Sequence, residues 1–338
     1  MVAGAVSCST VKFYTQAIGG QGEILRKSRP FEEVRADESV PDKVKGKLDV
    51  VNDIREFAES ELGLSAKRQY DRYADLGREH VVWVVFATPE LSLEARTWRY
   101  PLIGELEYRG YFKEKDATAL ADRLRSEGED VYLGGVDAYS TLGVFRDPIL
   151  NTFVGRHDAY LAELLFHELT HQRIYLKGDT DFNEALATAV GEEGARRWLK
   201  ARGSLRDLAA YESETKLVRE FIGLAMATRE KLDAVYGNPG LSDETKREAK
   251  ERVLKAFEKE AMIMNRRQGG SLKIEKWFEK PVNNARLNSL DTYYQLVPAF
   301  ETWIAECDGD LERFFERVKA MRKLDRDERR ERLGVGRP

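Results

Sequence analysis

Cysteine and histidine are scarce in this chain. Its 338 residues include only two cysteines, Cys8 and Cys307, and four histidines. Two cysteines so far apart in the sequence exclude a disulfide framework as the basis of the fold. Because histidine is so rare, two histidines placed four residues apart around a glutamate are unexpected by chance and indicate a specific site.

Long apolar runs and an excess of charge of one sign are also absent. No apolar run approaches the ~20 residues of a membrane-spanning helix. The 55 basic and 59 acidic side chains nearly balance, with a net charge of −4. Because no basic patch stands out, nucleic acid is not expected as a partner. The charged stretch 322–332 alternates in sign and is predicted to be a solvated helical tail.

Two of the histidines belong to residues 167–171, which read His-Glu-Leu-Thr-His. Strong helix formers precede this motif, so it is predicted to lie on a helix. Side chains four apart on a helix share one face, and two imidazoles so placed can bind one Zn²⁺ at about 2.0–2.1 Å. Glu168 stands beside the first ligand, where it can take a proton from the attacking water. We therefore predict that His167 and His171 bind zinc and that Glu168 is the general base.

A catalytic zinc uses three protein ligands and keeps one position for water. Glu184 is the best third ligand in this sequence. Residues 177–181 are predicted to form a turn, in which Gly178 ends the first helix and Asp181 caps the second. Glu184 then lies about one turn inside the second helix, at a height similar to that of His171. Imidazole ligands favour zinc over Mg²⁺ or Ca²⁺, so one Zn²⁺ per chain is expected.

The apolar pattern predicts an α+β fold that is predominantly α, with a small β-sheet followed by a helical bundle that carries the motif. Three regions are distinguished, which can also form one compact unit: an N-terminal helical segment (1–68), a small α/β region with the sheet (69–150) and the helical zinc-site region (151–338). Strands are expected at residues 81–87, 108–112 and 131–136. Helices are expected at residues 43–62, 115–127, 158–176, 182–202, 205–235, 242–267, 285–305 and 309–323.

Residues 167–172, followed by Asn183 and Glu184, resemble the gluzincin metallopeptidases, whose second helix supplies an Asn-Glu pair. A longer pattern resembles the bacterial zinc-dependent aminopeptidases. This resemblance implies a zincin-like fold and the hydrolysis of peptide substrates. It also implies that Tyr293 or Tyr294 donates a hydrogen bond to the oxyanion of the transition state. The other matching segments are residues 108–112, 134–143 and 290–298.

An aminopeptidase also needs a carboxylate that binds the α-amine of its substrate. Glu105, Glu107 and Asp137 are the candidates, because they lie near segments that match the family. Members of this family often carry two cysteines where this chain has Arg99 and Glu105, so an ion pair is expected in their place. The motif of residues 167–171 does not itself distinguish an aminopeptidase from an endopeptidase.

Ligating imidazoles usually donate their second ring N–H to a carboxylate or carbonyl group. Four acidic residues are available for this role, and the sequence does not rank them. His80 and His157 are expected to lie outside the metal site, because a lone histidine in a loop is most often a surface residue. The four acidic candidates are Asp158, Asp179, Glu192 and Glu193.

The N-terminal residues 5–8 read Ala-Val-Ser-Cys and resemble a bacterial lipobox. This resemblance implies a lipid anchor at Cys8 and a periplasmic protein of the bacterial cell envelope. The apolar run before Cys8 is shorter than the 7–15 residues of a signal peptide, and no basic residues precede it. A misassigned start, a trimmed chain and an accidental match therefore all stay open.

Two alternatives belong to other functional classes. A catalytically inactive, zincin-like scaffold of the envelope would bind zinc, and Glu168→Gln would leave its function intact. A helical interaction protein without metal would keep its melting temperature when His171 is replaced by alanine.

Overall fold

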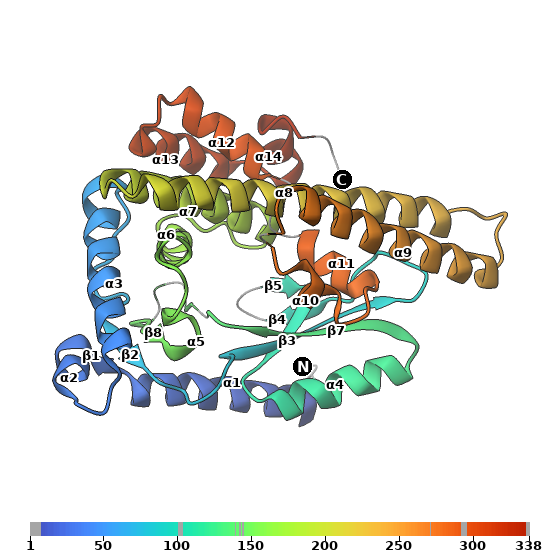
Figure 1. Ribbon diagram of the computed structural model, residues 1–338. Coiled ribbons are helices and arrows are strands. Elements are labelled where there is room, and N and C mark those ends of the chain that lie inside the picture. Colours follow the sequence, from blue (N-terminus) through green and yellow to red (C-terminus); the bar gives the residue numbers. More distant parts are fainter. Residues whose placement is uncertain are drawn as a thin grey trace.

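Two helices packed against each other form the centre of the molecule (Figure 1). They are α6 (Asp158–Arg173) and α7 (Thr180–Ala201), and a short turn connects them. Helix α3 (Asp42–Glu61) packs against α6, and α8 (Leu205–Tyr236) contacts α7. The structure, a computed structural model, describes residues 8–100, 104–138, 140–141, 143, 145–270, 272–291 and 296–335.

The other elements surround this central pair. The remaining helices are α1 (Cys8–Lys27), α2 (Phe31–Ala36), α4 (Glu114–Ser126), α5 (Asn151–Val154), α9 (Asp243–Arg267), α10 (Ile274–Phe278), α11 (Asn284–Asp291), α12 (Val297–Glu306), α13 (Leu311–Ala320), the 3-10 helix Met321–Lys323 and α14 (Arg326–Arg332). The strands are β1 (Arg29–Pro30), β2 (Arg72–Ala74), β3 (Val82–Pro89), β4 (Trp98–Tyr100), β5 (Gly104–Leu106), β6 (Tyr108–Tyr111), β7 (Glu129–Val136) and β8 (Ile149–Leu150).

The fold is α+β and predominantly α, as predicted, with 62% of residues in helices. The three predicted strands correspond to β3, β6 and β7, and most predicted helices are present with ends shifted by up to three residues. The single helix predicted over 285–305 is wrong. Helix α11 ends at Asp291, and α12 begins at Val297 with Pro298 in its first turn. Proline at this position suits the start of a helix and would break its interior.

Strand β3 is the central strand of an antiparallel sheet with the order β6-β3-β7. One face of this sheet packs on α4, through buried Val85 and Val131. Helix α11 also contacts β3 and β7, and Asn288 on this helix donates a hydrogen bond to Thr88 Oγ1 at 3.3 Å. A second small sheet, β1-β2-β8, leads directly into α5 and then α6, because β8 ends where α5 begins.

A large cluster of buried side chains fixes the central helices. Helix α3 contributes an apolar face to this cluster, in which Leu48, Val51 and Ile54 are fully buried. The cluster extends from Ile24 to Leu333 and joins α3, α6, α7, α12 and α13. No helix in the described part of the chain is long and apolar enough to cross a membrane.

Helices α6 and α7 approach so closely at Gly191 that no side chain fits between them. A Cβ atom at residue 191 would lie 2.9 Å from the carbonyl oxygen of Glu163 and 3.3 Å from Cβ of His167. The first contact is with backbone, which cannot rotate away as a flexible side chain can. The missing side chain therefore sets the distance between the two central helices.

We predict that Gly191→Ala pushes α6 and α7 apart and destabilises the protein by about 1–3 kcal/mol, because overpacking strains a dense core. Gly223→Ala is the matched control: Gly223 is also helical, and a Cβ there meets nothing within 4 Å. The control should be neutral or stabilising by up to about 1 kcal/mol, because alanine favours helix. Thermal and urea unfolding of both variants provide the comparison. Equal stabilities would contradict the close approach at Gly191.

Candidate metal centre

His167, His171 and Glu184 converge on one point between α6 and α7. Nε2 of His167 lies 3.1 Å from Nε2 of His171 and 3.3 Å from Oε2 of Glu184, and Nε2 of His171 lies 3.6 Å from Oε1 of Glu184. Three ligand atoms that bind a tetrahedral zinc at 2.0–2.1 Å are about 3.3–3.4 Å apart. These three side chains could therefore hold a single metal ion.

Charge and burial at this point also suit a cation. The side chains are 16%, 5% and 20% exposed for His167, His171 and Glu184, respectively. Burial raises the pKa of Glu184, but hydrogen bonds to both imidazoles outweigh it and leave the pKa well below its usual range. Burial lowers the pKa of His167, but the carboxylate of Glu184 outweighs it and raises the pKa. The ionised carboxylate and two imidazoles form a His₂Glu set, as in catalytic zinc sites.

Glu168 lies beside this point in a carboxylate-rich environment. Burial raises its pKa, His167 and His171 oppose this, and the negative charges of Glu184 and Asp147 raise the pKa further. Asp147 is 2% exposed and accepts hydrogen bonds from the backbone N–H and hydroxyl of Thr141, at 2.9 and 2.8 Å. The surroundings of Glu168 thus favour proton uptake by its carboxylate.

Asn183 holds the turn between the two central helices. Its side chain accepts a hydrogen bond from the backbone N–H of Leu176 and donates one to the carbonyl oxygen of the same residue, both at 2.7 Å. Asn183 is 1% exposed, so these bonds are protected from water. The residue before the proposed ligand Glu184 therefore ties the start of α7 to Leu176 in the connecting turn.

The predicted ends of the two central helices need correction. Helix α6 ends at Arg173 rather than 176, because Ile174 has extended backbone angles. Gly178 has a φ of +81° and lies in the turn itself. Asp179, not Asp181, occupies the N-cap position of α7, and its side chain makes no capping hydrogen bond. Glu184 still lies just over one turn inside α7, as predicted.

Several tyrosines near the two glutamates were missed by the sequence reasoning. Burial and the negative charges of Glu184 and Glu168 raise the pKa of Tyr108, on β6. Burial and Glu184 likewise raise the pKa of Tyr175, whose ring centre lies 6.3 Å from that of His171. The signal available in the sequence was the position of Tyr175, four residues after His171. Tyr293 and Tyr294 lie outside the described residues.

The candidates for binding an α-amine lie in different surroundings. Asp137 already pairs with His80 at 2.7 Å and with Arg156 at 3.2 Å, so both of its carboxylate oxygens are engaged. Glu105 accepts a hydrogen bond from Thr97 Oγ1 at 2.5 Å. It stands opposite Arg99 in the β4–β5 ladder, and the ion pair expected between these two residues stays a prediction. Glu107 is exposed.

The other histidine and two acidic candidates also have partners of their own. His157 accepts a hydrogen bond from the backbone N–H of Ala159 at 3.5 Å and so caps α6. Asp158 pairs with Lys47, and Asp179 pairs with Arg329. The Nδ1 atom of His171 is buried without a hydrogen-bond partner among the described residues.

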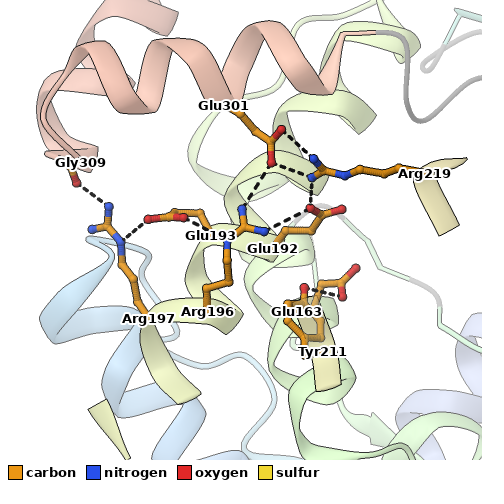
Figure 2. Close-up of polar contacts among 9 residues, drawn as sticks. All are labelled: Glu163, Glu192, Glu193, Arg196, Arg197, Tyr211, Arg219, Glu301 and Gly309. Atoms are coloured by element: carbon orange, nitrogen blue, oxygen red, sulfur yellow. Dashed lines mark hydrogen bonds and ion pairs between the residues drawn. The ribbon is translucent and has the colours of Figure 1, made fainter. Parts of the chain in front are cut away.

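Glu192 and Glu193, the remaining acidic candidates, belong to a network of ion pairs on α7 (Figure 2). Glu192 is 2% exposed and pairs with Arg196 at 3.5 Å and with Arg219 of α8. Arg219 also binds Glu301 of α12 at 2.6 Å. Glu193 accepts a hydrogen bond from Arg197, whose guanidinium donates to the carbonyl oxygen of Gly309 at 2.6 Å. The network therefore ties α7 to α8 and α12.

Glu163 of α6, one helical turn before His167, adds negative charge to the surroundings of Glu192. Tyr211 on α8 donates its hydroxyl hydrogen to Glu163 at 2.9 Å, and both side chains are drawn in Figure 2. Burial raises the pKa of Glu192 to about 7, the negative charges of Glu163 and Glu301 add to this rise, and Arg219 and Arg196 oppose it. Ionisation of Glu192 therefore lowers the stability of the folded state.

We predict that Glu192 makes the protein less stable as the pH rises from about 4.5 to about 7. The folded state binds more protons than the unfolded state in this window, so stability falls by up to about 1.4 kcal/mol per pH unit. Glu192→Gln should flatten this slope, and Glu251→Gln, at an exposed ion pair on α9, should not. Calorimetry from pH 4.5 to 8 measures the difference. Parallel curves for wild type and Glu192→Gln would contradict the assignment.

Comparison with known proteins identifies the family of this chain. No curated protein and no solved structure matches it. A family model described as "Putative aminopeptidase" matches residues 12–333. This range includes the sheet, both central helices and the three converging side chains. The chain therefore belongs to this putative aminopeptidase family.

Proposed function

We propose that this protein is a zinc aminopeptidase of the gluzincin type with a zincin-like fold. The observation that carries this proposal is the convergence of His167, His171 and Glu184, whose ligand atoms lie within 4.8 Å of one another. Membership of the aminopeptidase family supports peptides as substrates. One zinc ion per chain would be held by these three side chains.

Each residue of the site then has a defined task. When bound, zinc supplies the positive charge that makes a water molecule nucleophilic near neutral pH. Glu168 accepts a proton from this water as the water oxygen attacks the peptide carbonyl carbon. The same carboxyl group then gives the proton to the amine nitrogen as the C–N bond breaks. His167, His171 and Glu184 keep the reacting groups in place.

We predict that Glu168→Gln retains zinc but loses peptidase activity by a factor of about 10²–10⁴, because it removes proton transfer alone. Both proteins are incubated with a mixed peptide library, and the products are read by mass spectrometry. Equal zinc content is the control for an intact site. Loss of single N-terminal residues with the wild type alone is the expected result.

Two other results would change the proposal. Internal cuts by the wild type alone would keep the roles of zinc and Glu168 but make the protein an endopeptidase. The same peptide products from the wild type and from Glu168→Gln would contradict catalysis by Glu168 and favour the inactive envelope scaffold.

We further propose that Tyr293 or Tyr294 donates a hydrogen bond to the oxyanion. Replacing the residue that has this role by phenylalanine should lower kcat by a factor of about 10²–10³. Tyr108→Phe and Tyr175→Phe are the matched comparisons, since both hydroxyls interact electrostatically with Glu184. Steady-state kinetics of the four variants decide between them. Unchanged kcat in both Tyr293→Phe and Tyr294→Phe would remove these residues from the mechanism.

We also propose that the native protein is periplasmic and anchored to the cell envelope through a lipid on Cys8. Cys8 is the first residue of α1, so the lipid would be attached directly at the start of this helix. Mass spectrometry of protein isolated from native membranes tests this attachment. An intact, unmodified N-terminus would contradict it.

A further inference from the structure

We propose that the C-terminal helix α14 positions the metal ligand Glu184 and that Arg329 is the positioning residue. This inference rests on the proposed metal site. The sequence predicted a solvated helical tail over 322–332, and the structure corrects this prediction at Arg329 and Arg330, although most of this stretch is helical and exposed. Arg330 is only 5% exposed, and three arginines of α14 bind the residues just before Glu184.

The contacts of α14 cover both acidic residues at the start of α7. Nε of Arg329 donates to Asp179 at 2.6 Å, and these side chains are 12% and 4% exposed. Arg326 and Arg330 bind one carboxylate oxygen of Asp181 at 2.5 and 3.1 Å. Because Asp179 is buried, its charge depends on the guanidinium of Arg329 for compensation.

Arg329 acts where the direction of α7 is set. Asp179 occupies the N-cap position of α7, but its side chain makes no capping bond to the helix. The carboxylate binds Arg329 instead, so the side-chain contact that holds the N-cap residue comes from α14 and not from α7. The guanidinium of Arg329 also lies 5.9 Å from the ring centre of Phe182, two residues before Glu184. Phe182 in turn packs edge-on against Phe300 of α12, with ring centres 5.1 Å apart.

Helix α14 is itself firmly attached, so it can serve as an anchor. Asp325 and Glu328 form a reciprocal capping box at its start. A second nitrogen of Arg329 donates to the carbonyl oxygen of Leu324. Leu333, just after the helix, is buried in the main hydrophobic cluster. The first two contacts stabilise α14 locally, and Leu333 joins its C-terminal end to the main cluster.

A metal site requires this kind of support. Ligand distances must stay within about 0.2 Å of their ideal values. Loss of the groups that orient a ligand typically weakens metal binding 10–100-fold. Asn183 binds the start of α7 to the preceding turn. Helix α14, near the C-terminus, binds the same part of α7 through Asp179 and Asp181. Without Arg329, Glu184 would lose its fixed position relative to His167 and His171.

The test is the zinc dissociation constant of the full-length protein, measured by competition with a chelator. Arg329→Met should weaken zinc binding 10–100-fold, and Arg329→Lys should restore part of it. Arg332→Met, at an exposed position on the same helix, is the matched control and should bind zinc like the wild type. Circular dichroism of each metal-free variant verifies that it is folded.

A double variant, Asp179→Asn with Arg329→Met, separates positioning from charge compensation. It removes both buried charges, so it remains informative even where Arg329→Met alone does not fold. Zinc binding that stays 10–100-fold weaker in the double variant supports positioning. Wild-type affinity in the double variant, or in Arg329→Met, would overturn this inference alone. A wild type that binds no zinc would overturn the proposed function and this inference together.

Discussion

The close approach of α6 and α7 is the constraint on which the rest of the structure depends. One helix carries His167 and His171 and the other carries Glu184, so the separation of the two helices sets the size of the candidate site. Gly191 permits this separation, because a Cβ atom there would meet the backbone of Glu163. The geometry of the site therefore depends on Gly191, about two helical turns after the third ligand, because this residue has no side chain.

Helix α7 is held at several points along its length. Asn183 binds the turn at its start, and the acidic residues beside it bind the arginines of α14. Farther along, Glu192 joins α7 to α8 through Arg219, which also binds α12 through Glu301. Burying so many charges costs solvation energy, and buried ion pairs often contribute little net stability. What they provide in this arrangement is a fixed direction for the helix that presents Glu184.

The sequence predicted the local elements well and the tertiary contacts less well. The spacing of His167 and His171 on a helix, and of Glu184 on the next, follows from helical periodicity alone, so the convergence could be anticipated. The buried face of α3 could be anticipated for the same reason. Strands of two or three residues, such as β1 and β8, are too short to produce a readable pattern.

Contacts between distant segments could not be foreseen. The alternating charges of 322–332 are equally typical of a solvated helix and of one that docks on acidic partners. Only the fold brings Arg329 to Asp179, 150 residues earlier in the chain. The tyrosines near the site illustrate the same limit, because Tyr108 reaches Glu184 through the placement of β6 and not through any local motif.

Crystals of the zinc-loaded protein, measured on both sides of the zinc absorption edge, test the central claim most directly. We expect one anomalous peak per chain, about 2.0–2.1 Å from Nε2 of His167, Nε2 of His171 and a carboxylate oxygen of Glu184. No peak at this point, or a peak held by other residues, would contradict the account.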